Sequence, residues 1–191
     1  MKLRVISGSA RGKRLEVPKG NIRPLSERAR EALFNILAPR IAESDFLDLF
    51  AGSGAVGIEA LSRGARISIF AEMDKKSVPV IWANLENAGF SDRAEVYALP
   101  VSQALKILNK KSAKFDIIFL GAPYGSPSLN EALKVIGTAP ASRMAGLLKP
   151  SAVVIAEHRS KQNLEAQIGE LLMFRQERYG DTMFSFYKGN K

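Results

Sequence analysis

The chain has 191 residues, of which 46% are hydrophobic and 25% are charged, a composition typical of one ordinary soluble domain with a small appendage. It holds no run of about 18 apolar residues and does not start like a signal peptide, so we expect a cytoplasmic protein that has no membrane partner. The absence of cysteine excludes a disulfide framework, and a single histidine argues against a metal centre.

The net charge of +9 is concentrated near the amino terminus. Residues 1–30 hold nine basic and two acidic groups, a balance of +7, which leaves +2 for the other 161 residues. Because lysine and arginine placed on phosphates release counterions, this concentration favours a nucleic-acid partner over an ordinary solvated basic surface. The residues that we expect to contact the polyanion are Arg4, Arg11, Lys13, Arg14, Arg23, Arg28 and Arg30.

The first segment reads as a hairpin. Residues 3–7 and 13–17 alternate polar and apolar side chains around residues 8–12, a pattern that predicts two strands with a flexible tip. Proline and glycine then interrupt the chain, so we expect a basic hairpin arm over residues 1–24 and a main domain over residues 25–191. Ser26 offers an N-cap to a helix, and its core-facing stripe consists of Ala29, Leu33, Ile36 and Leu37.

A strand, a tight glycine turn and a helix come next. Residues 46–50 form a short apolar run, and Gly52, Gly54 and Gly57 follow before a helical pattern that stops at Gly64. Glycine lets a backbone approach a ligand where any Cβ would collide with it. The stretch therefore predicts a ligand site in the turn.

Two acidic residues indicate what the ligand is. The three glycines also satisfy the dinucleotide fingerprint, which keeps a dehydrogenase as an alternative. However, Asp48 stands just before the turn, where we expect its carboxylate to face the ligand and to repel a pyrophosphate. S-adenosylmethionine carries an ammonium and a sulfonium and no phosphate. Glu72 ends a second strand at the spacing where an acid accepts hydrogen bonds from ribose hydroxyls.

The rest of the chain alternates helices and strands. This alternation predicts a parallel sheet covered on both faces, with ligands at the carboxyl ends of its strands. At the end of the chain, a Gly180-Asp181 turn predicts a final hairpin. We expect helices over residues 75–87, 101–108, 129–136, 142–148 and 164–171, and strands over residues 94–99, 115–120, 153–157, 173–179 and 182–188.

Several segments resemble the RsmD-type guanine-N2 methyltransferases of bacterial 16S ribosomal RNA, and together they cover nearly the whole chain. They are Arg4-Val5-Ile6-Ser7-Gly8, Gly12-Lys13-Arg14-Leu15, Arg23-Pro24, residues 30–37, residues 47–65 and Tyr179-Gly180-Asp181-Thr182. The resemblance implies a Rossmann-like α/β fold of the class I methyltransferases, with a mostly parallel seven-stranded sheet and an antiparallel last strand. It also implies that the basic amino-terminal β-hairpin arm binds RNA.

The same resemblance implies the reaction. S-adenosyl-L-methionine would be the methyl donor, and a guanine N2 amine of ribosomal RNA, free or in a small-subunit assembly particle, would be the acceptor. No metal is implied. The cofactor contacts would come from Asp48, Phe50, Gly52, Gly54, Glu72 and Met73.

The turn after the fourth strand departs from the family pattern. Gly121, Ala122, Pro123 and Tyr124 stand where the family has an Asp or Asn, two prolines and an aromatic residue. An exocyclic amine is a poor nucleophile, and acceptors that bind its hydrogens orient its lone pair toward the methyl group. Gly121 has no side chain for this task. What remains is the Ala122 carbonyl, with the Tyr124 ring as a plane on which a flipped base could stack, worth about 1–3 kcal/mol.

Two further hypotheses stay open beside the leading one. The altered turn suggests an RNA-binding relative that keeps the cofactor pocket but has lost methyl transfer. A DNA adenine-N6 methyltransferase would use the same type of turn and an amine acceptor, although no extra domain for reading DNA is evident. His158 is expected to be structural, because the sulfonium leaves readily and no strong base is required.

Overall fold

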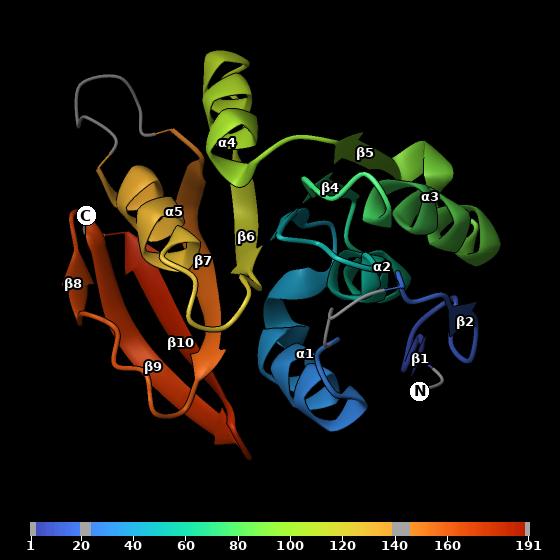
Figure 1. The fold of residues 1–191 in the computed structure, drawn as a ribbon, viewed down its shortest axis with the longest axis horizontal. Helices are drawn as coiled ribbons and strands as arrows, with labels where there is room; N and C mark the ends of the chain where they lie inside the picture. The colour runs from blue at the N-terminus through green and yellow to red at the C-terminus, as the bar shows by residue number, and fades with distance from the viewer. Residues whose placement is uncertain (1–2, 20–23, 139–145, 190–191) are drawn as a thin grey trace.

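The computed structural model describes residues 3–19, 24–138 and 146–189, and these build one large sheet with helices packed on it (Figure 1). The strands are β1 Leu3–Arg4, β2 Arg14–Leu15, β3 Asp45–Leu49, β4 Ile67–Ala71, β5 Ala94–Tyr97, β6 Phe115–Leu120, β7 Leu148–Arg159, β8 Gln167–Ile168, β9 Leu171–Tyr179 and β10 Thr182–Gly189. The helices are α1 Glu27–Ile41, α2 Ala55–Ser62, α3 Ser77–Ala88, α4 Val101–Lys110 and α5 Ser128–Gly137, with a short 3-10 helix η1 Ser91–Arg93.

The large sheet has eight strands in the order β5-β4-β3-β6-β7-β10-β9-β8. Strands β3 to β7 pair in parallel, whereas β10 runs antiparallel to both of its neighbours, β7 and β9. This arrangement confirms the expected mostly parallel sheet with an antiparallel last strand. The additional strand is β8, which has two residues and lies at the edge beside β9.

The helices cover the two faces of the sheet. One hydrophobic cluster joins α4 and α5 to the side chains of one face, such as Leu47 and Ile118. A second joins α1 to the other face through Phe46 and Ile117. Because successive side chains of a strand point to opposite faces, neighbours in sequence enter different clusters, and all five residues of β3 are buried. Strand β3 is therefore apolar on both faces, apart from its two buried aspartates, Asp45 and Asp48.

Helix α1 forms as its sequence predicts. The Ser26 hydroxyl accepts a hydrogen bond from the Ala29 amide at 3.2 Å, which satisfies one of the unpaired donors at the helix start. The buried face then includes Ala29, Leu33 and Leu37. Phe34 completes this face in place of the expected Ile36, which is only partly buried.

The expected helix over residues 164–171 is wrong. The chain forms β8 and β9 there, joined by a two-residue turn in which Gly169 has a φ of +56°. In this hairpin Ile168 pairs with Leu171, and both are buried. Two residues that face each other across such a turn are three apart in sequence, so the hairpin reproduces the spacing of a helical stripe. Of the helix expected over residues 142–148, residues 142–145 lie outside the described part, and Leu148 belongs to β7.

The amino-terminal hairpin packs firmly on the main domain. Leu3, Val5 and Leu15 share a hydrophobic cluster with α2 and α3. The expected flexible tip is wrong: the Ser9 amide donates to the Ser62 carbonyl at 2.8 Å, and a Cβ on Gly8 would collide with the backbone of Ser62. The tip is therefore seated on the end of α2.

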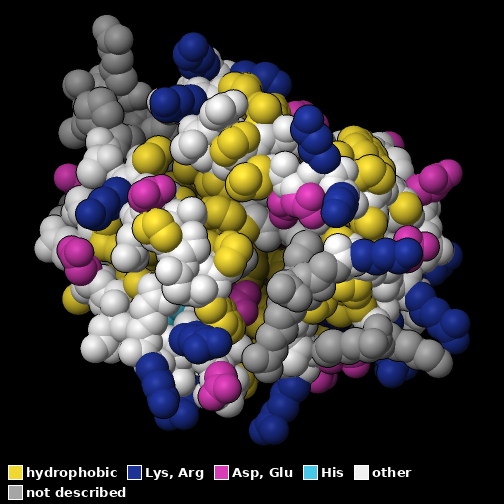
Figure 2. Space-filling view, in the orientation of Figure 1, with side chains coloured by type: hydrophobic (Ala, Val, Ile, Leu, Met, Phe, Trp, Pro, Cys, Tyr) yellow, Lys and Arg dark blue, Asp and Glu magenta, His cyan; other side chains and the backbone are white. Residues whose placement is uncertain are grey.

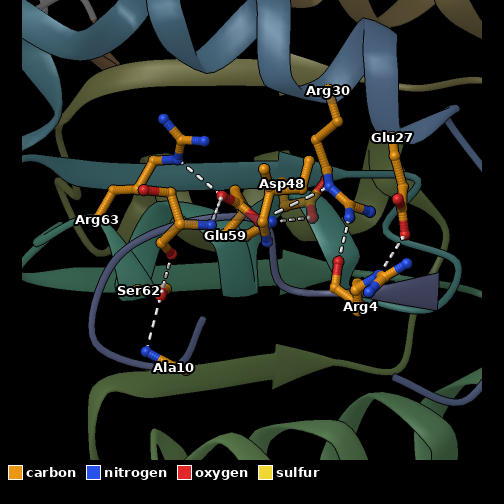
Figure 3. A network of polar contacts seen from close by, with 11 residues as sticks. Arg4, Ala10, Glu27, Arg30, Asp48, Glu59, Ser62 and Arg63 are labelled. Carbon is orange, nitrogen blue, oxygen red and sulfur yellow. Dashed lines mark hydrogen bonds and ion pairs between the residues drawn. The ribbon is translucent and has the colours of Figure 1, made fainter. Parts of the chain in front are cut away.

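Buried polar groups fasten the hairpin as well (Figure 3). Glu59 of α2 is fully buried and accepts hydrogen bonds from the amides of Ile6 and Ser7 at 2.8 and 3.0 Å. Its carboxylate also pairs with Arg63, at 2.7 Å, and with Arg30 of α1, at 3.8 Å. One buried carboxylate thus joins the hairpin to two helices.

Candidate functional site

The register of the sheet brings four positions into one row at the carboxyl ends of adjacent strands. Leu49 pairs with Ala71 and with Leu120, and Leu120 pairs with Ala156. The residues that follow these four form a row across the sheet: Glu72 after β4, Phe50 after β3, Gly121 after β6 and Glu157 on β7. In open α/β sheets this edge is where ligands bind.

The glycine turn has the backbone conformation that its sequence predicts. Phe50, Gly52 and Gly54 all have positive φ values, of 64°, 56° and 76°. Such values place the turn in the left-handed region, which glycine adopts without a steric cost. The Gly54 amide donates to the Ala51 carbonyl at 2.7 Å, and helix α2 starts immediately afterwards. The turn thus presents backbone close to the N-terminus of α2.

Gly57 serves packing within α2. A Cβ at this position would overlap the Phe70 ring and come within 2.6 Å of the Ser68 hydroxyl oxygen, both on β4. Glycine therefore lets α2 lie close against the sheet, which fixes the height of the turn above the strand ends. This is the role of the third glycine in the dinucleotide fingerprint.

Glu72 lies at the outer side of the turn. Its carboxylate accepts hydrogen bonds from the amides of Gly52 and Asp74, both at 2.8 Å, so it links the turn to the end of β4. The residue is 9% exposed. Met73, the next residue, is 66% exposed and leaves an apolar side chain at the edge of the site.

Asp48 lies beneath the turn, which corrects the expectation that its carboxylate faces the ligand directly. It is 1% exposed and accepts a hydrogen bond from the Gly57 amide at 2.9 Å. Burial raises the pKa of Asp48 to about 8; the Gly57 amide opposes this rise, and the charges of Glu72 and Glu157 add to it. A cationic ligand placed over the turn would favour the ionised form. Asp48 can therefore supply a negative charge below the turn when a cation is bound above the turn.

Residues 121–124, which follow β6 and which we call the acceptor turn, lie beside the glycine turn. The Gly121 amide donates to the Leu49 carbonyl at 3.1 Å, which fastens the start of the turn to β3. Ala122 is buried in the core on the α5 side, and Pro123 is exposed. The Tyr124 hydroxyl donates to Glu157 at 2.9 Å and lies 3.1 Å from the Thr182 hydroxyl.

Glu157 is a site residue that the sequence reasoning did not assign. It ends the row described above, and its carboxylate reaches over the neighbouring strand toward Gly121. The available signal was its place at the carboxyl end of a predicted strand. His158, the next residue, is buried; its ring contacts the Arg159 carbonyl and the Ser185 hydroxyl at 2.9 and 2.8 Å, as expected for a structural residue.

The expected nucleic-acid contacts divide into three groups. Arg11, Lys13, Arg14 and Arg28 are exposed, as is Arg4, whose guanidinium pairs with Glu27 at 3.4 Å. Arg23 lies outside the described residues. Arg30 is a correction: it is fully buried, contacts the Arg4 carbonyl and pairs with Glu59, so its guanidinium cannot reach a polyanion in this structure.

Two hollows on the described part of the molecule bear on where a ligand could bind. Figure 2 shows one in the middle of the drawn face, lined by hydrophobic side chains and with an acidic side chain inside it. A second, a cleft of about 680 Å³, lies between β2 and α3 and contains none of the residues expected at the cofactor site. The second cleft is lined by Leu3, Arg14, Leu15, Glu16, Val17, Ala83, Asn84 and Asn87.

Two other kinds of feature are absent from the described part of the chain. None of its helices combines the length and the apolar character needed to cross a bilayer. Its His, Asp and Glu residues nowhere form a group of three that could hold a metal ion.

Comparisons with known proteins cover almost the whole chain. The model of a family described as Conserved hypothetical protein 95 matches residues 3–188. The Bacillus subtilis protein YlbH, named as a candidate rRNA methyltransferase, is 36% identical over 187 residues, which is 97% of this chain and 98% of the relative. The Escherichia coli ribosomal RNA small subunit methyltransferase D is 31% identical over 187 residues, covering 97% of this chain and 89% of the relative.

A solved structure agrees with the sequence comparisons. The Escherichia coli protein yhhF, named as a candidate methyltransferase, superposes with a TM-score of 0.82 at 31% sequence identity. The match covers 99% of this chain and 98% of that one. The likeness therefore extends over the hairpin, the sheet and the final strands together.

Proposed function

We propose that this chain methylates a guanine N2 amine of small-subunit ribosomal RNA. The premise is that it belongs to the family described as Conserved hypothetical protein 95, the RsmD-type methyltransferases. Relatives named as rRNA methyltransferases support methylation of ribosomal RNA. The observation in the structure that carries the proposal is the row of Glu72, Phe50, Gly121 and Glu157, which sets a glycine turn directly beside an acceptor turn.

The residues around the glycine turn fit S-adenosylmethionine, the cofactor of this family. Gly52 and Gly54 adopt the positive φ values that this tight turn needs, and a Cβ on Gly54 would lie only 3.2 Å from the Ile81 side chain. Glu72 offers carboxylate oxygens for ribose hydroxyls, and exposed Met73 offers an apolar contact for the adenine. Asp48 supplies a negative potential from below the turn once a cation favours its ionised form. When bound, the cofactor supplies an electrophilic methyl group.

The reaction needs positioning rather than a strong base. With the cofactor bound, the guanine N2 lone pair would form the new N–C bond, and the sulfur would keep the electron pair of the broken S–C bond. The methylated amine then loses a proton. The task of the protein is to hold the amine in line with the methyl group and to exclude water, and such positioning can supply about 7–11 kcal/mol of the barrier.

The exposed basic residues of the hairpin and of the start of α1 would hold the RNA. Arg11, Lys13 and Arg14 lie on the hairpin, and Arg28 lies in the first turn of α1. The fixed seat of the hairpin on α2 supports a rigid RNA platform rather than a mobile arm. An assembling small subunit in the cytoplasm is the proposed setting, because flipping a base costs least where the base is not yet paired and stacked.

Methyl transfer to defined substrates tests the proposal. The purified chain is incubated with radiolabelled S-adenosylmethionine and small subunits from cells that lack the corresponding modification, with naked 16S RNA and duplex DNA as parallel substrates. We expect label in N2-methylguanine of the RNA. Binding of the cofactor without transfer to any substrate would instead identify an inactive RNA-binding relative, and labelled DNA adenine would identify an adenine methyltransferase.

A further inference from the structure

We propose that Glu157 accepts the hydrogen bond from the target amine that no side chain at Gly121 can accept. This inference rests on the proposed function and adds a catalytic residue to it. The acceptor turn itself offers no side-chain oxygen before Tyr124, since its first three residues are glycine, alanine and proline. A carboxylate from the neighbouring strand fills the place.

The register and the distances place the Glu157 carboxylate beside Gly121. Leu120 pairs with Ala156, so Gly121 and Glu157 are the next neighbours on parallel strands. A Cβ built on Gly121 would lie 3.5 Å from Glu157 Oε2. The carboxylate of an aspartate at position 121 would extend from that Cβ into the same region. Glu157 therefore brings a carboxylate from β7 to the place that an acid on β6 would otherwise occupy.

Neighbouring groups hold this carboxylate in one orientation. Glu157 Oε1 accepts the Tyr124 hydroxyl at 2.9 Å, and that hydroxyl lies 3.1 Å from the Thr182 hydroxyl at the start of β10. The Arg159 guanidinium lies over the Tyr124 ring at 5.6 Å. Because a carboxylate has about four acceptor positions, a bond from Tyr124 and a bond from an amine are compatible. Tyr124 is thus a positioning residue for Glu157.

Glu157 also lies within electrostatic range of the cofactor turn. Its charge contributes to the raised pKa of Asp48, which lies directly below that turn. The Gly121 amide donates to the carbonyl of Leu49, the residue immediately before Phe50 of the glycine turn. The carboxylate, the acceptor turn and the glycine turn consequently border one space, which is the geometry that transfer from a donor to an amine requires.

The chemistry assigned to Glu157 is limited and balanced. Its carboxylate accepts a hydrogen bond from one N2–H of the guanine, and the lone pair of N2 points at the methyl carbon. As the N–C bond forms, the S–C bond breaks with its electron pair on sulfur, and N2 becomes positively charged. The N2 proton then moves to the Glu157 carboxylate and from there to water.

Three variants test the assignment against wild type, with methyl transfer and cofactor binding measured separately. Glu157→Ala should lower kcat about 10²–10³-fold, the loss typical of one positioned polar group, and should leave the affinity for S-adenosylhomocysteine in calorimetry unchanged. Tyr124→Phe should lower kcat less than Glu157→Ala does, because it removes the group that orients the carboxylate and leaves the carboxylate in place. Glu177→Ala is the matched control, because Glu177 and Glu157 flank Phe184 of β10 in the same register, and its kcat should equal that of wild type.

A rescue separates a catalytic role from a structural one. In the double variant Gly121→Asp/Glu157→Ala, the new carboxylate can enter the vacated region, and the backbone of Gly121 does not have a positive φ that would oppose a side chain. The Phe119 ring, 3.0 Å from the position of the new Cβ, must yield by a few tenths of an ångström. We expect at least a tenfold recovery of kcat over Glu157→Ala.

The outcomes discriminate clearly. Wild-type protein that binds cofactor but transfers no methyl group refutes the proposed function itself. An active wild type with an equally active Glu157→Ala variant overturns only the role of Glu157. Loss of activity without any recovery in the double variant, at an unchanged melting temperature, likewise overturns it, because a carboxylate in that region would then be insufficient.

Discussion

The Asp48 carboxyl group lies where water cannot solvate its charge, and this makes stability depend on pH. Its folded-state pKa of about 8 lies above the ordinary value of 3.8. The stability that the protonated group contributes is therefore fully present below about pH 4 and is lost as pH rises toward 8, by up to about 1.4 kcal/mol per pH unit. Asp48→Asn keeps an acceptor for the Gly57 amide but does not ionise. The variant should gain stability over wild type as pH rises from 5 to 8.5, measured by urea unfolding.

Asp92→Asn serves as the control for this pH series. Asp92 is exposed on η1, so its replacement should change the free energy of unfolding by no more than about 0.5 kcal/mol at either pH. If Asp48→Asn and wild type unfold with the same pH dependence, the burial of a protonated carboxyl below the turn is refuted. Asp48→Asn should also bind S-adenosylmethionine more weakly than wild type, because asparagine cannot supply the negative charge that attracts the cation.

Gly57 is the glycine whose replacement should damage packing most clearly. Alanine is better than glycine inside a helix by about 1 kcal/mol, but its Cβ would collide with Phe70 and Ser68. A Cβ only 2.3 Å from a ring carbon belongs at the upper end of the about 1–3 kcal/mol that overpacking costs, so Gly57→Ala should destabilise the protein by a net of about 2 kcal/mol despite its helix propensity. Urea unfolding of the variant measures the difference.

A glycine with open space around it provides the comparison for Gly57→Ala. Gly180 has a φ of +63° in the β9–β10 turn, and a Cβ added there would have no atom of the described residues within 4 Å. Gly180→Ala should cost only the strain of a left-handed residue, about 1–2 kcal/mol, and should leave cofactor affinity unchanged. Gly57→Ala should weaken cofactor binding too, since α2 carries the turn. Equal affinities in the two variants would argue against this coupling.

The residue-scale differences between expectation and structure have identifiable causes. Arg30 was expected on the surface because it is basic, yet it precedes Leu33, Phe34 and Leu37 by three, four and seven residues, the spacing of the buried face of α1. That periodicity was available in the sequence. The proximity of Glu157 to Gly121 was not, because it depends on which strand lies beside β6, and strand order is a property of the whole sheet.

The hairpin is the element whose attachment depends most on one residue. Glu59 is buried with Arg30 and holds the amides of Ile6 and Ser7. Glu59→Gln would leave the buried guanidinium without its counter-charge and place an amide group against a backbone donor. Breaking a buried pair from one side costs about 3–5 kcal/mol. We expect a loss of this order in urea unfolding, with faster hydrogen exchange at the two amides.

An exposed ion pair between the same hairpin and α1 is the matched control. Arg4 and Glu27 pair at 3.4 Å with side-chain exposures of 62% and 38%. Exposed pairs of this kind contribute about 0–1 kcal/mol, so Glu27→Gln should leave the exchange of the Ile6 and Ser7 amides nearly unchanged. If both variants had the same small effect, Glu59 would not be what fastens the hairpin.

At the scale of elements, periodicity predicted most helices and strands but failed where two structures share one pattern. Ile168 and Leu171 satisfy the spacing of a helix and also that of a two-residue hairpin. Gly169 in a left-handed turn decides between them in the structure, and a glycine inside a helix would cost about 1 kcal/mol. Gly169 was therefore a signal in the sequence for a hairpin. Nothing in the sequence indicated that β8 lies at the edge of the sheet beside β9.

For the whole molecule, alternation of strands and helices was sufficient to predict the parallel sheet and the edge at which we propose the site. Sequence order does not reveal that β10 enters between β7 and β9, and the family resemblance implied only that the last strand is antiparallel. The distribution of charge was likewise only partly predictable from the sequence. The basic excess of residues 1–30 was visible in the sequence, but the structure separates exposed Arg11, Lys13 and Arg14 from buried Arg30.

The exposed basic residues of the hairpin should determine how RNA binding responds to salt. Each phosphate contact contributes about 0.7–0.9 to the slope of log K against log salt. Replacing Arg11, Lys13 and Arg14 by glutamine should therefore lower the slope by about 2 in titrations of 16S RNA fragments. The control replaces three exposed lysines of α4 and α5, on the opposite side of the sheet in Figure 1, namely Lys106, Lys110 and Lys134. An equal decrease in both triple variants would mean that RNA responds to net charge alone, and that the hairpin is not the surface that receives it.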